Sequence, residues 1–266
     1  MAHILFRGIV IASMTVATAA IAGDVANSRQ ELAPTGKLRT GVVSAPKANV
    51  FFVVTDANGR PHGVTVDLGD ELARTLGVEG EYFVAHNSGE ITDALENGRI
   101  DVAFLPVDDE RRQRVAFGPS YNLFESTCLV LGGSVFRTVS DLDRPGVRVA
   151  GEANTTTIRA AARELKSASI LAVPSVAEAI DMLRSGRIDA FALGRDALVP
   201  YQAEIPGSRI LEGRLHSSAI AIAVPKQRPA ALAYVSAFLN EAKSSGLIRR
   251  VFDKAGLQSA MAAPAE

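Results

Sequence analysis

The sequence DALENGRID at residues 93–101 returns in a close variant, DMLRSGRID, at residues 181–189. A small apolar run follows each copy, VAFL at residues 102–105 and AFAL at residues 190–193. Gly98 and Gly186 stand where a left-handed residue can end a helix without a Cβ penalty. The apolar runs suit strands that are covered on both faces. Two copies of this helix-to-strand unit predict two similar α/β lobes, and paired lobes favour a ligand cleft between them.

The segments around both copies alternate in the same way. Around the first copy we expect strands at 37–43 and 81–85 and helices at 65–76 and 91–97. Around the second copy we expect strands at 147–150 and 170–173 and helices at 156–165 and 176–185. This βαβαβ order predicts, in each lobe, a mostly parallel sheet with helices on both faces. The predicted fold class is therefore α/β, with two Rossmann-like lobes.

The last part of the chain predicts a return to the first lobe, with a strand at 219–224 and helices at 229–243 and 247–255. We expect lobe one to comprise residues 37–127 and 219–257 and lobe two to comprise residues 128–218. The two crossings between the lobes would form a two-strand hinge. Residues 23–36 predict a flexible leader, and the Ala-rich residues 258–266 predict a frayed, disordered tail.

The first 22 residues are typical of an export signal. Arg7 supplies the positive charge, residues 8–22 are small and apolar, and Ala20-Ile21-Ala22 fits the A-x-A cleavage pattern. A membrane anchor is the alternative, but the stretch is short and no second apolar span follows it. We expect cleavage after Ala22 and a mature chain in the periplasm.

The charge and the cysteine content exclude several classes of protein. The chain has 28 Lys and Arg and 29 Asp and Glu, so loss of Arg7 leaves 27 − 29 = −2, and nucleic acid is not an expected partner. The single cysteine, Cys128, lies in the apolar run CLVL and predicts a buried, inert thiol. The four histidines show no metal-ligand spacing, and residues 151–154 lack the phosphate-binding glycine patterns. We expect neither a metal nor a cofactor.

Several phrases, in order, resemble a known family. They are GKLRTGV at 36–42, GVTVDL at 63–68, DER at 109–111 with Phe117 beyond it, DL at 141–142, Thr155, and GRIDA at 186–190. In this order they resemble the family-three periplasmic solute-binding proteins of ABC importers. The resemblance implies the type II periplasmic-binding-protein architecture, which closes around a small solute and then meets the membrane subunits of an importer. It also implies a monomer.

The resemblance carries roles to particular residues. It implies that Arg111 grips a ligand carboxylate, that the backbone N–H of Thr155 opposes it from lobe two, and that Phe52 covers the ligand. Two departures are visible: Asn154 replaces the family's glycine before the threonine, and Gly194 stands where amino-acid-binding members place an aspartate. The resemblance with these departures favours a small anionic or carboxylated solute over a standard α-amino acid.

Each of these residues has a simpler interpretation. Arg111 belongs to the basic run RRQR and could be solvated. Asn154 and Thr155 could be ordinary helix caps. Asp101 and Asp189, at the ends of the two repeats, are expected to steady the turns.

Two other functions stay open at this stage. A dehydratase-like enzyme on the same scaffold would need a cleft acid or base, and Glu125, Glu152 and Asp196 are the candidates, although we expect Glu152 at the rim and no turnover. A free periplasmic sensory domain is the third possibility.

Overall fold

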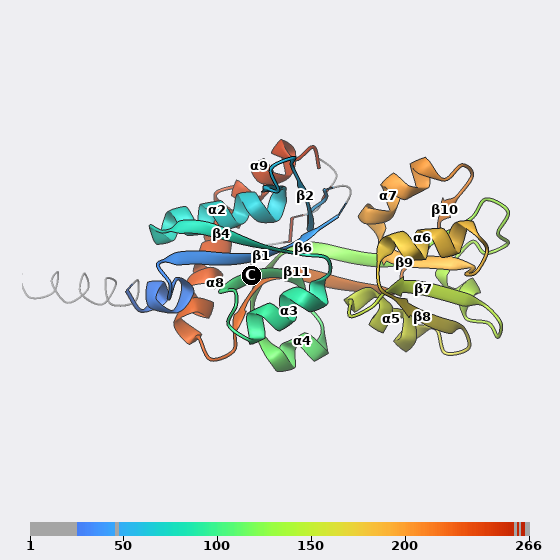
Figure 1. Cartoon of the computed structure of the whole chain (residues 1–266), viewed down its shortest axis with the longest axis horizontal. Helices are drawn as coiled ribbons and strands as arrows, with labels where there is room; N and C mark the ends of the chain where they lie inside the picture. The colour runs from blue at the N-terminus through green and yellow to red at the C-terminus, as the bar shows by residue number, and fades with distance from the viewer. Residues whose placement is uncertain (1–25, 46–47, 258–259, 261, 264–266) are drawn as a thin grey trace, which may run out of the picture.

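The computed structural model describes residues 26–45, 48–257, 260 and 262–263, and it shows two α/β lobes joined by two long strands (Figure 1). Up to the first long strand the elements are β1 (Lys37–Ser44), β2 (Phe52–Thr55), β3 (Pro61–His62), α2 (Val64–Leu76), β4 (Glu79–Ala85), α3 (Ser88–Glu96), β5 (Val102–Pro106), α4 (Asp109–Arg114) and β6 (Val115–Val130). Lobe two follows with the 3₁₀ helix η1 (Val139–Leu142), β7 (Arg148–Glu152), α5 (Thr156–Glu164), β8 (Ser169–Val173), α6 (Val176–Arg184), β9 (Ala190–Gly194), α7 (Arg195–Glu204) and β10 (Arg209–Ile210). The chain then returns through β11 (His216–Pro225) to α8 (Pro229–Ser244) and α9 (Leu247–Lys254).

The strands form one continuous sheet through both lobes, in the order β3-β2-β1-β5-β11-β6-β9-β7-β8. Within lobe one, β1 pairs in parallel with β2, β4 and β5, and within lobe two, β7 pairs in parallel with β8 and β9. The bridging strands β6 and β11 run antiparallel to each other. The predicted two-lobed α/β architecture is confirmed, and the bridge additionally fuses the two parallel halves into a single sheet.

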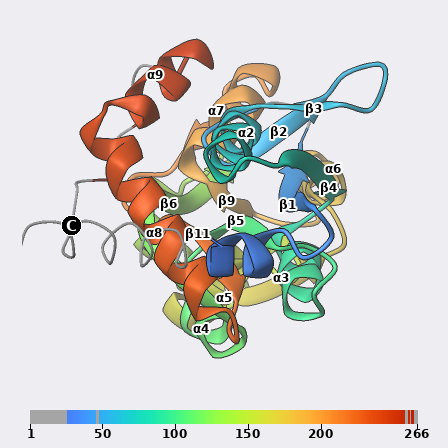
Figure 2. The same cartoon turned by 90° about the vertical axis from the view of Figure 1, so that its left-hand side faces the viewer.

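The helices cover the sheet on both sides. Figure 2 shows lobe one from its outer end, with α2 and α9 on one side of the strands and α3 and α4 on the other. This arrangement sets up two different contacts with lobe two, because α3 and α4 face α5 while β2 lies on the side of α6 and α7 (Figure 1). The cleft between the lobes therefore has two unlike sides.

The repeated phrase ends its helix as expected in both lobes. Gly98 has φ 68° and Gly186 has φ 69°, and each backbone N–H donates to the carbonyl of the leucine three residues before it, at 3.2 and 3.1 Å. The aspartates that close the two phrases also have matching partners. Asp101 accepts from the backbone N–H and Nε of Arg39, and Asp189 accepts from the same two groups of Arg148. Both therefore link a repeat strand to its neighbouring strand, whereas the sequence predicts only that they steady the turns.

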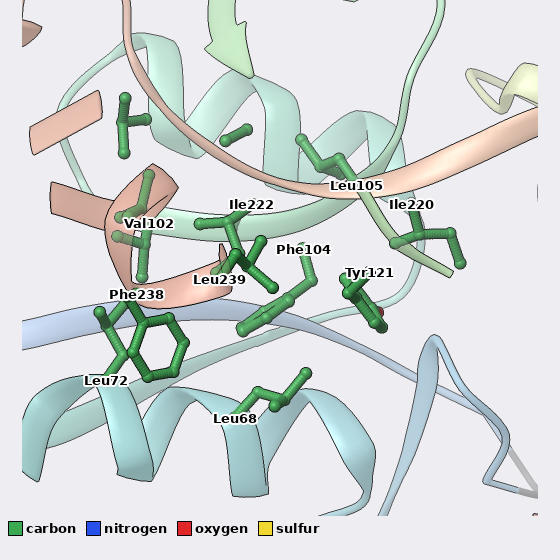
Figure 3. Packing of buried hydrophobic residues seen from close by; sticks show 14 of the residues in the cluster. Leu68, Leu72, Val102, Phe104, Leu105, Tyr121, Ile220, Ile222, Phe238 and Leu239 are labelled. Carbon is green, nitrogen blue, oxygen red and sulfur yellow. The ribbon is translucent and has the colours of Figure 1, made fainter. Parts of the chain in front are cut away.

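A large apolar core fills lobe one, where α2 and α8 pack against β5, β6 and β11 (Figure 3). Lobe two has two smaller cores, one on each face of its sheet. Consecutive residues of β7 divide between them, since Val149 belongs to one core and Ala150 to the other. Strands that are buried on both faces explain why the runs VAFL and AFAL are continuously apolar. Cys128 is fully buried, and burial raises the pKa of its thiol, as expected for an inert cysteine.

The two ends of the described chain are more ordered than the composition suggests. Residues 26–32 are helical, and Leu32 and Ala33 join the lobe-one core, where the sequence predicts a flexible leader. Near the other end, the backbone N–H of Ala263 donates to the carbonyl of Tyr121 at 2.9 Å, where the sequence predicts a frayed tail. In both places the segment contacts residues of lobe one that are distant in sequence. The predicted export signal lies outside the described residues, and no helix within them is long and apolar enough to cross a membrane.

Candidate functional site

A cavity of about 410 Å³ lies between the lobes on the side of β2, α6 and α7. Its lobe-one wall comprises the end of β1, the residues before β2, Phe52 and His86. Its lobe-two wall comprises the end of β7, Leu193 of β9, and residues along the whole length of α6 and α7, Tyr201 among them. A cavity of this size, with aromatic walls and a few polar groups, suits a solute about as large as an amino acid.

The charged side chains on the cavity wall are mostly acidic. Four carboxylates line the cavity, whereas Arg184 is the single arginine or lysine among its described lining residues; the acids are Glu152, Asp181, Asp196 and Glu204. Arg184 is exposed on α6. The wall therefore favours a positively charged group in the solute over a negatively charged one.

Glu152 is the most buried of these acids. It ends β7, is 6% exposed, and its carboxylate forms no hydrogen bond or ion pair within the described part of the chain. Burial, with a smaller contribution from the charge of Glu90, raises the pKa of Glu152 to about 7. An unpaired buried carboxylate is costly to ionise, and a bound cation would relieve that cost. The sequence predicts a rim residue here, but the strand end places Glu152 inside the wall.

Asp196 lies in the first turn of α7 and faces the same cavity. The side chain keeps contact with solvent through the open cleft, but the concave wall around it partly desolvates it. This desolvation raises the pKa of Asp196, and the charge of Arg195 opposes the effect. Arg195 itself donates to Glu125 at 3.3 Å, so it is directed away from Asp196. Asp196 is thus a second acid without a hydrogen-bonding partner among the described residues.

Arg111 lies on the opposite side of the cleft, where α3 and α4 meet α5. It is 1% exposed, and burial lowers the pKa of its guanidinium to about 10 although Asp108 opposes the shift. Nε donates to Thr92 at 3.1 Å, and one terminal nitrogen donates to the carbonyl of Pro106 at 3.0 Å. The remaining donors reach Ser88 at 2.6 Å, Thr156 at 2.5 Å and the carbonyl of Asn154 at 3.4 Å. Arg111 is therefore a buried residue and not part of a solvated basic run.

The contacts of Arg111 belong to a network that joins the two lobes. The hydroxyl of Thr156 donates to Asp108 at 2.8 Å, and Arg159 donates to Asp108 and pairs with Glu110 at 3.0 Å. Burial alone would raise the pKa of Asp108, but hydrogen bonds from the backbone of Arg111 and from Arg159 lower it. We call Asp108, Glu110, Arg111, Thr156 and Arg159 the interlobe network. It holds the lobes together on the α4–α5 side.

Asn154 and Thr155 occupy the turn before α5. Asn154 has φ 60°, which is rare for a residue other than glycine and directs its carbonyl toward Arg111. Thr155 is the N-cap of α5, because its hydroxyl accepts from the backbone N–H of Ile158 at 3.3 Å and donates to the carbonyl of Glu152 at 2.8 Å. The capping interpretation of Thr155 is therefore confirmed. Thr155 also lines a narrow cavity of about 30 Å³ beneath the large one.

Phe52 borders both cavities, and Phe124 closes the narrow one from the hinge side. The ring of Phe124 lies against Gly194, so closely that a Cβ at position 194 would stand 2.5 Å from it. The position that the resemblance compares with an aspartate therefore has no room for a side chain while Phe124 keeps this place. Side chains therefore fill the part of the cleft next to the hinge strands, and the cavity of about 410 Å³ lies on the side of α7.

The structure thus divides the expected site residues into two groups. Phe52, Glu152 and Asp196 line the large cavity. Arg111 belongs to the interlobe network and contacts the carbonyl of Asn154, and Thr155 lines the narrow cavity. Sequence reasoning missed Asp108, Thr156 and Arg159, as well as Tyr201 in the cavity wall. Asp108 directly precedes the phrase DER and Thr156 directly follows Thr155, so proximity in sequence to these predicted residues was the available signal. Within the described residues, no group of His, Cys, Asp and Glu side chains could hold a metal ion.

Comparison with known proteins gives consistent results. The family model of bacterial extracellular solute-binding proteins, family 3, matches residues 42–258. The ABC transporter glutamine-binding protein GlnH of Bacillus subtilis is 28% identical over 211 residues, which cover 77% of this chain and 76% of that protein.

Solved structures agree with this assignment. The arginine-bound form of truncated ArgBP from T. maritima is 29% identical with a TM-score of 0.68, and the match covers 80% of this chain and 99% of that one. An ancestral amino acid-binding protein, described as a precursor of cyclohexadienyl dehydratase, is 28% identical with a TM-score of 0.72, and the match covers 85% of this chain and 97% of that one.

Proposed function

The chain belongs to the bacterial extracellular solute-binding proteins of family 3, and we propose that it captures a small, positively charged solute for an ABC importer. The membership accounts for solute binding in transport and for a location outside the cytoplasmic membrane. The solute class is our proposal, as are the monomeric state and the meeting of the closed protein with the importer's membrane subunits. The observation that carries the solute class is the pair of acids Glu152 and Asp196 on one cavity wall, neither of which has a hydrogen-bonding partner among the residues that the structure describes.

The geometry indicates how such a solute would be held. Its cationic group would lie between the acidic wall and the aromatic side chains of Phe52 and Tyr201. Aromatic faces attract cations, and this attraction grows when water is excluded. The apolar part of the solute would contact Ile180 and Leu193 on lobe two. A similar protein is arginine-bound in its solved structure, which agrees with a cationic solute.

The sequence predicts an anionic or carboxylated solute instead, and this part of the prediction is not confirmed. The prediction of an anionic solute depends on Arg111 as the residue that binds a carboxylate. In this structure the N–H groups of Arg111 donate to protein groups. A solute with both charges stays compatible with the cleft, because Arg184 lies at its edge.

Calorimetric titration of the mature protein with L-arginine, L-lysine, L-glutamine and L-glutamate tests the proposal. We expect binding of the cationic pair and a loss of affinity in Glu152→Gln and Asp196→Asn. Glu178→Gln is the matched control, since Glu178 is an exposed acid on α6 outside the cavity. Tight binding of L-glutamate with no binding of the cationic pair would contradict the proposal.

A dehydratase-like enzyme is the second candidate function, and one observation favours it. A carboxyl group with a pKa of about 7 inside a cleft can serve as a general acid or base near neutral pH. We still expect no turnover, because none of the described residues that line the cavity forms a hydrogen bond with the carboxylate of Glu152. NMR spectra of each bound compound, followed over hours, test for turnover. Conversion that disappears in Glu152→Gln would make the enzyme the better supported of the two functions.

A further inference from the structure

We propose that Tyr121 and Ala263 are positioning residues for the cleft. Together they fix the turn at residues 49–52, which forms part of the lobe-one wall of the large cavity. Neither residue borders the large or the narrow cavity, so they act on a solute only through this turn. The proposal goes beyond the proposed function, because it concerns how the wall is built. Only its affinity measurement rests on the proposed cationic solute.

The turn at residues 49–52 closes on itself. The side-chain oxygen of Asn49 accepts from the backbone N–H groups of Phe51 and Phe52 at 2.8 and 2.6 Å. The backbone N–H of Asn49 donates to the carbonyl of Phe52 at 3.0 Å, so the turn is a small, stiff unit. Asn49 and Phe52 line the large cavity, whereas Val50 and Phe51 belong to the lobe-one core. The place where this unit is fixed therefore decides where Phe52 meets a solute.

Tyr121 fixes the turn from the side of the core. Its hydroxyl donates to the carbonyl of Val50 at 2.8 Å, and the residue is 0% exposed. The ring of Tyr121 lies edge-on against Phe104, with the ring centroids 5.7 Å apart (Figure 3), and against Phe252 at 6.4 Å. A buried hydroxyl and a buried carbonyl both need a partner, and this hydrogen bond supplies one to each. Loss of the hydroxyl would release the turn from the core at this point.

The residues that follow α9 support Tyr121 through its backbone. Strand β6 has an extra residue at Tyr121, since Ser120 and Asn122 pair with consecutive residues of β11. The carbonyl of Tyr121 accepts from the backbone N–H of Ala263 at 2.9 Å. Ala262 forms an antiparallel bridge with Asn122, and Ala263 is 4% exposed. The extra residue of the hinge strand is therefore paired with the end of the described chain.

Arg249 of α9 fixes the path of the chain toward Tyr121. Its guanidinium donates to the carbonyls of Leu257 and Ala260 at 2.8 and 2.9 Å. Contacts thus run from α9 through Ala263 and Tyr121 to the wall of the cavity. Tyr121 joins the two ends of this path, because its carbonyl bonds to Ala263 and its hydroxyl bonds to the turn.

Hydrogen exchange of the ligand-free protein, measured by mass spectrometry, tests the role of Tyr121 without a solute. Tyr121→Phe removes only the hydroxyl and leaves the carbonyl of Val50 without this donor. We expect the amides of residues 49–55 to exchange roughly 2- to 10-fold faster than in the parent, the range for loss of one hydrogen bond. Tyr82→Phe is the matched control, because the Tyr82 hydroxyl also donates to a lobe-one carbonyl, that of Val66 at 2.9 Å, and Tyr82 does not line the cleft. Exchange at residues 49–55 that is unchanged in Tyr121→Phe, or equally faster in Tyr82→Phe, would overturn the proposal.

The role of Ala263 has a separate pair of variants. Ala263→Pro removes the N–H that donates to Tyr121, and we expect faster exchange at residues 49–55, by a smaller factor than in Tyr121→Phe. Ala262→Pro is the control, because Ala262 is exposed and its N–H donates to no residue that the structure describes. Parent-like exchange in Ala263→Pro, or the same increase in Ala262→Pro, would overturn the role of Ala263.

Calorimetry with L-arginine connects the turn to the solute. We expect Tyr121→Phe to weaken binding of L-arginine roughly 2- to 10-fold and Tyr82→Phe to bind it like the parent. Faster exchange at residues 49–55 without any loss of affinity would overturn the positioning role. If the parent protein binds neither L-arginine nor L-lysine, the proposed solute class fails, and the exchange experiment alone decides whether Tyr121 and Ala263 fix the wall.

Discussion

Glu152 couples solute binding to pH at the scale of one residue. Its pKa of about 7 in the empty cleft means that it binds a proton below neutrality, and a cationic solute favours the ionised form. Binding must therefore release a proton at low pH and none at high pH. We expect the affinity for a cationic ligand to rise roughly 10- to 30-fold between pH 5.5 and pH 8 and then to level off. Calorimetry across that range in the parent and in Glu152→Gln checks this, and an equally steep dependence in the variant would assign the proton to another group.

Asp101 and Asp189 make a second comparison at this scale, since the repeat gives them the same local sequence. Asp101 is 0% exposed and pairs with Arg39 and Arg228, whereas the Asp189 side chain is 31% exposed. Removing one partner of a buried ion pair costs about 3–5 kcal/mol, because the other charges stay buried without it. We expect Asp101→Asn to lower the free energy of unfolding by an amount in this range and Asp189→Asn to lower it much less. Urea denaturation of both variants provides the measurement, and equal losses would show that burial does not decide the effect.

The contact between α3 and the turn before α5 sets how closely the lobes approach, at the scale of elements. Gly89 is the second residue of α3, and a Cβ there would stand 2.5 Å from the Cβ of Asn154. Alanine favours a helix over glycine by up to about 1 kcal/mol, so Gly89→Ala should not destabilise lobe one. It should instead hold the lobes apart and break the contacts of Arg111 with lobe two. We expect small-angle scattering to give a larger radius of gyration for Gly89→Ala than for the parent protein, and the Tm of the variant to be unchanged or higher. A normal radius would mean that α3 moves aside within lobe one.

Export belongs to the scale of the whole molecule. The order of Arg7, an apolar run and Ala20-Ile21-Ala22 predicts cleavage after Ala22. Residues 26–32, just beyond this point, form a helix on lobe one. Mass spectrometry of the protein from the periplasmic fraction should find Gly23 as the first residue. A product that keeps Met1 and sediments with the membrane would contradict the prediction.

The fold followed from local sequence to a large extent. Gly98 and Gly186, the apolar runs after them and the order of caps and strands act within a few residues of one another, so their effects are visible without tertiary contacts. The repeated phrase predicted the two lobes, and the apolar run at 219–224 predicted the return through β11. The leader and the tail could not be predicted, because Leu32 and Ala263 are ordered by partners far away in sequence.

The candidate site shows the same difference between what local sequence predicts and what tertiary contacts decide. From the sequence alone, Arg111, Asn154, Glu152 and Asp196 were predicted to lie near the cleft, through the resemblance and through the segments in which they stand. Only the tertiary structure decided which of them meets open volume and which meets protein. The partners of Arg111 on lobe two are 43 and 45 residues away in sequence, and the packing of the two lobes brings them within hydrogen-bonding distance. Hydrogen-bond donors are used by whatever acceptor is nearest in space, so their availability to a solute depends on the relative positions of the lobes and not on the local pattern.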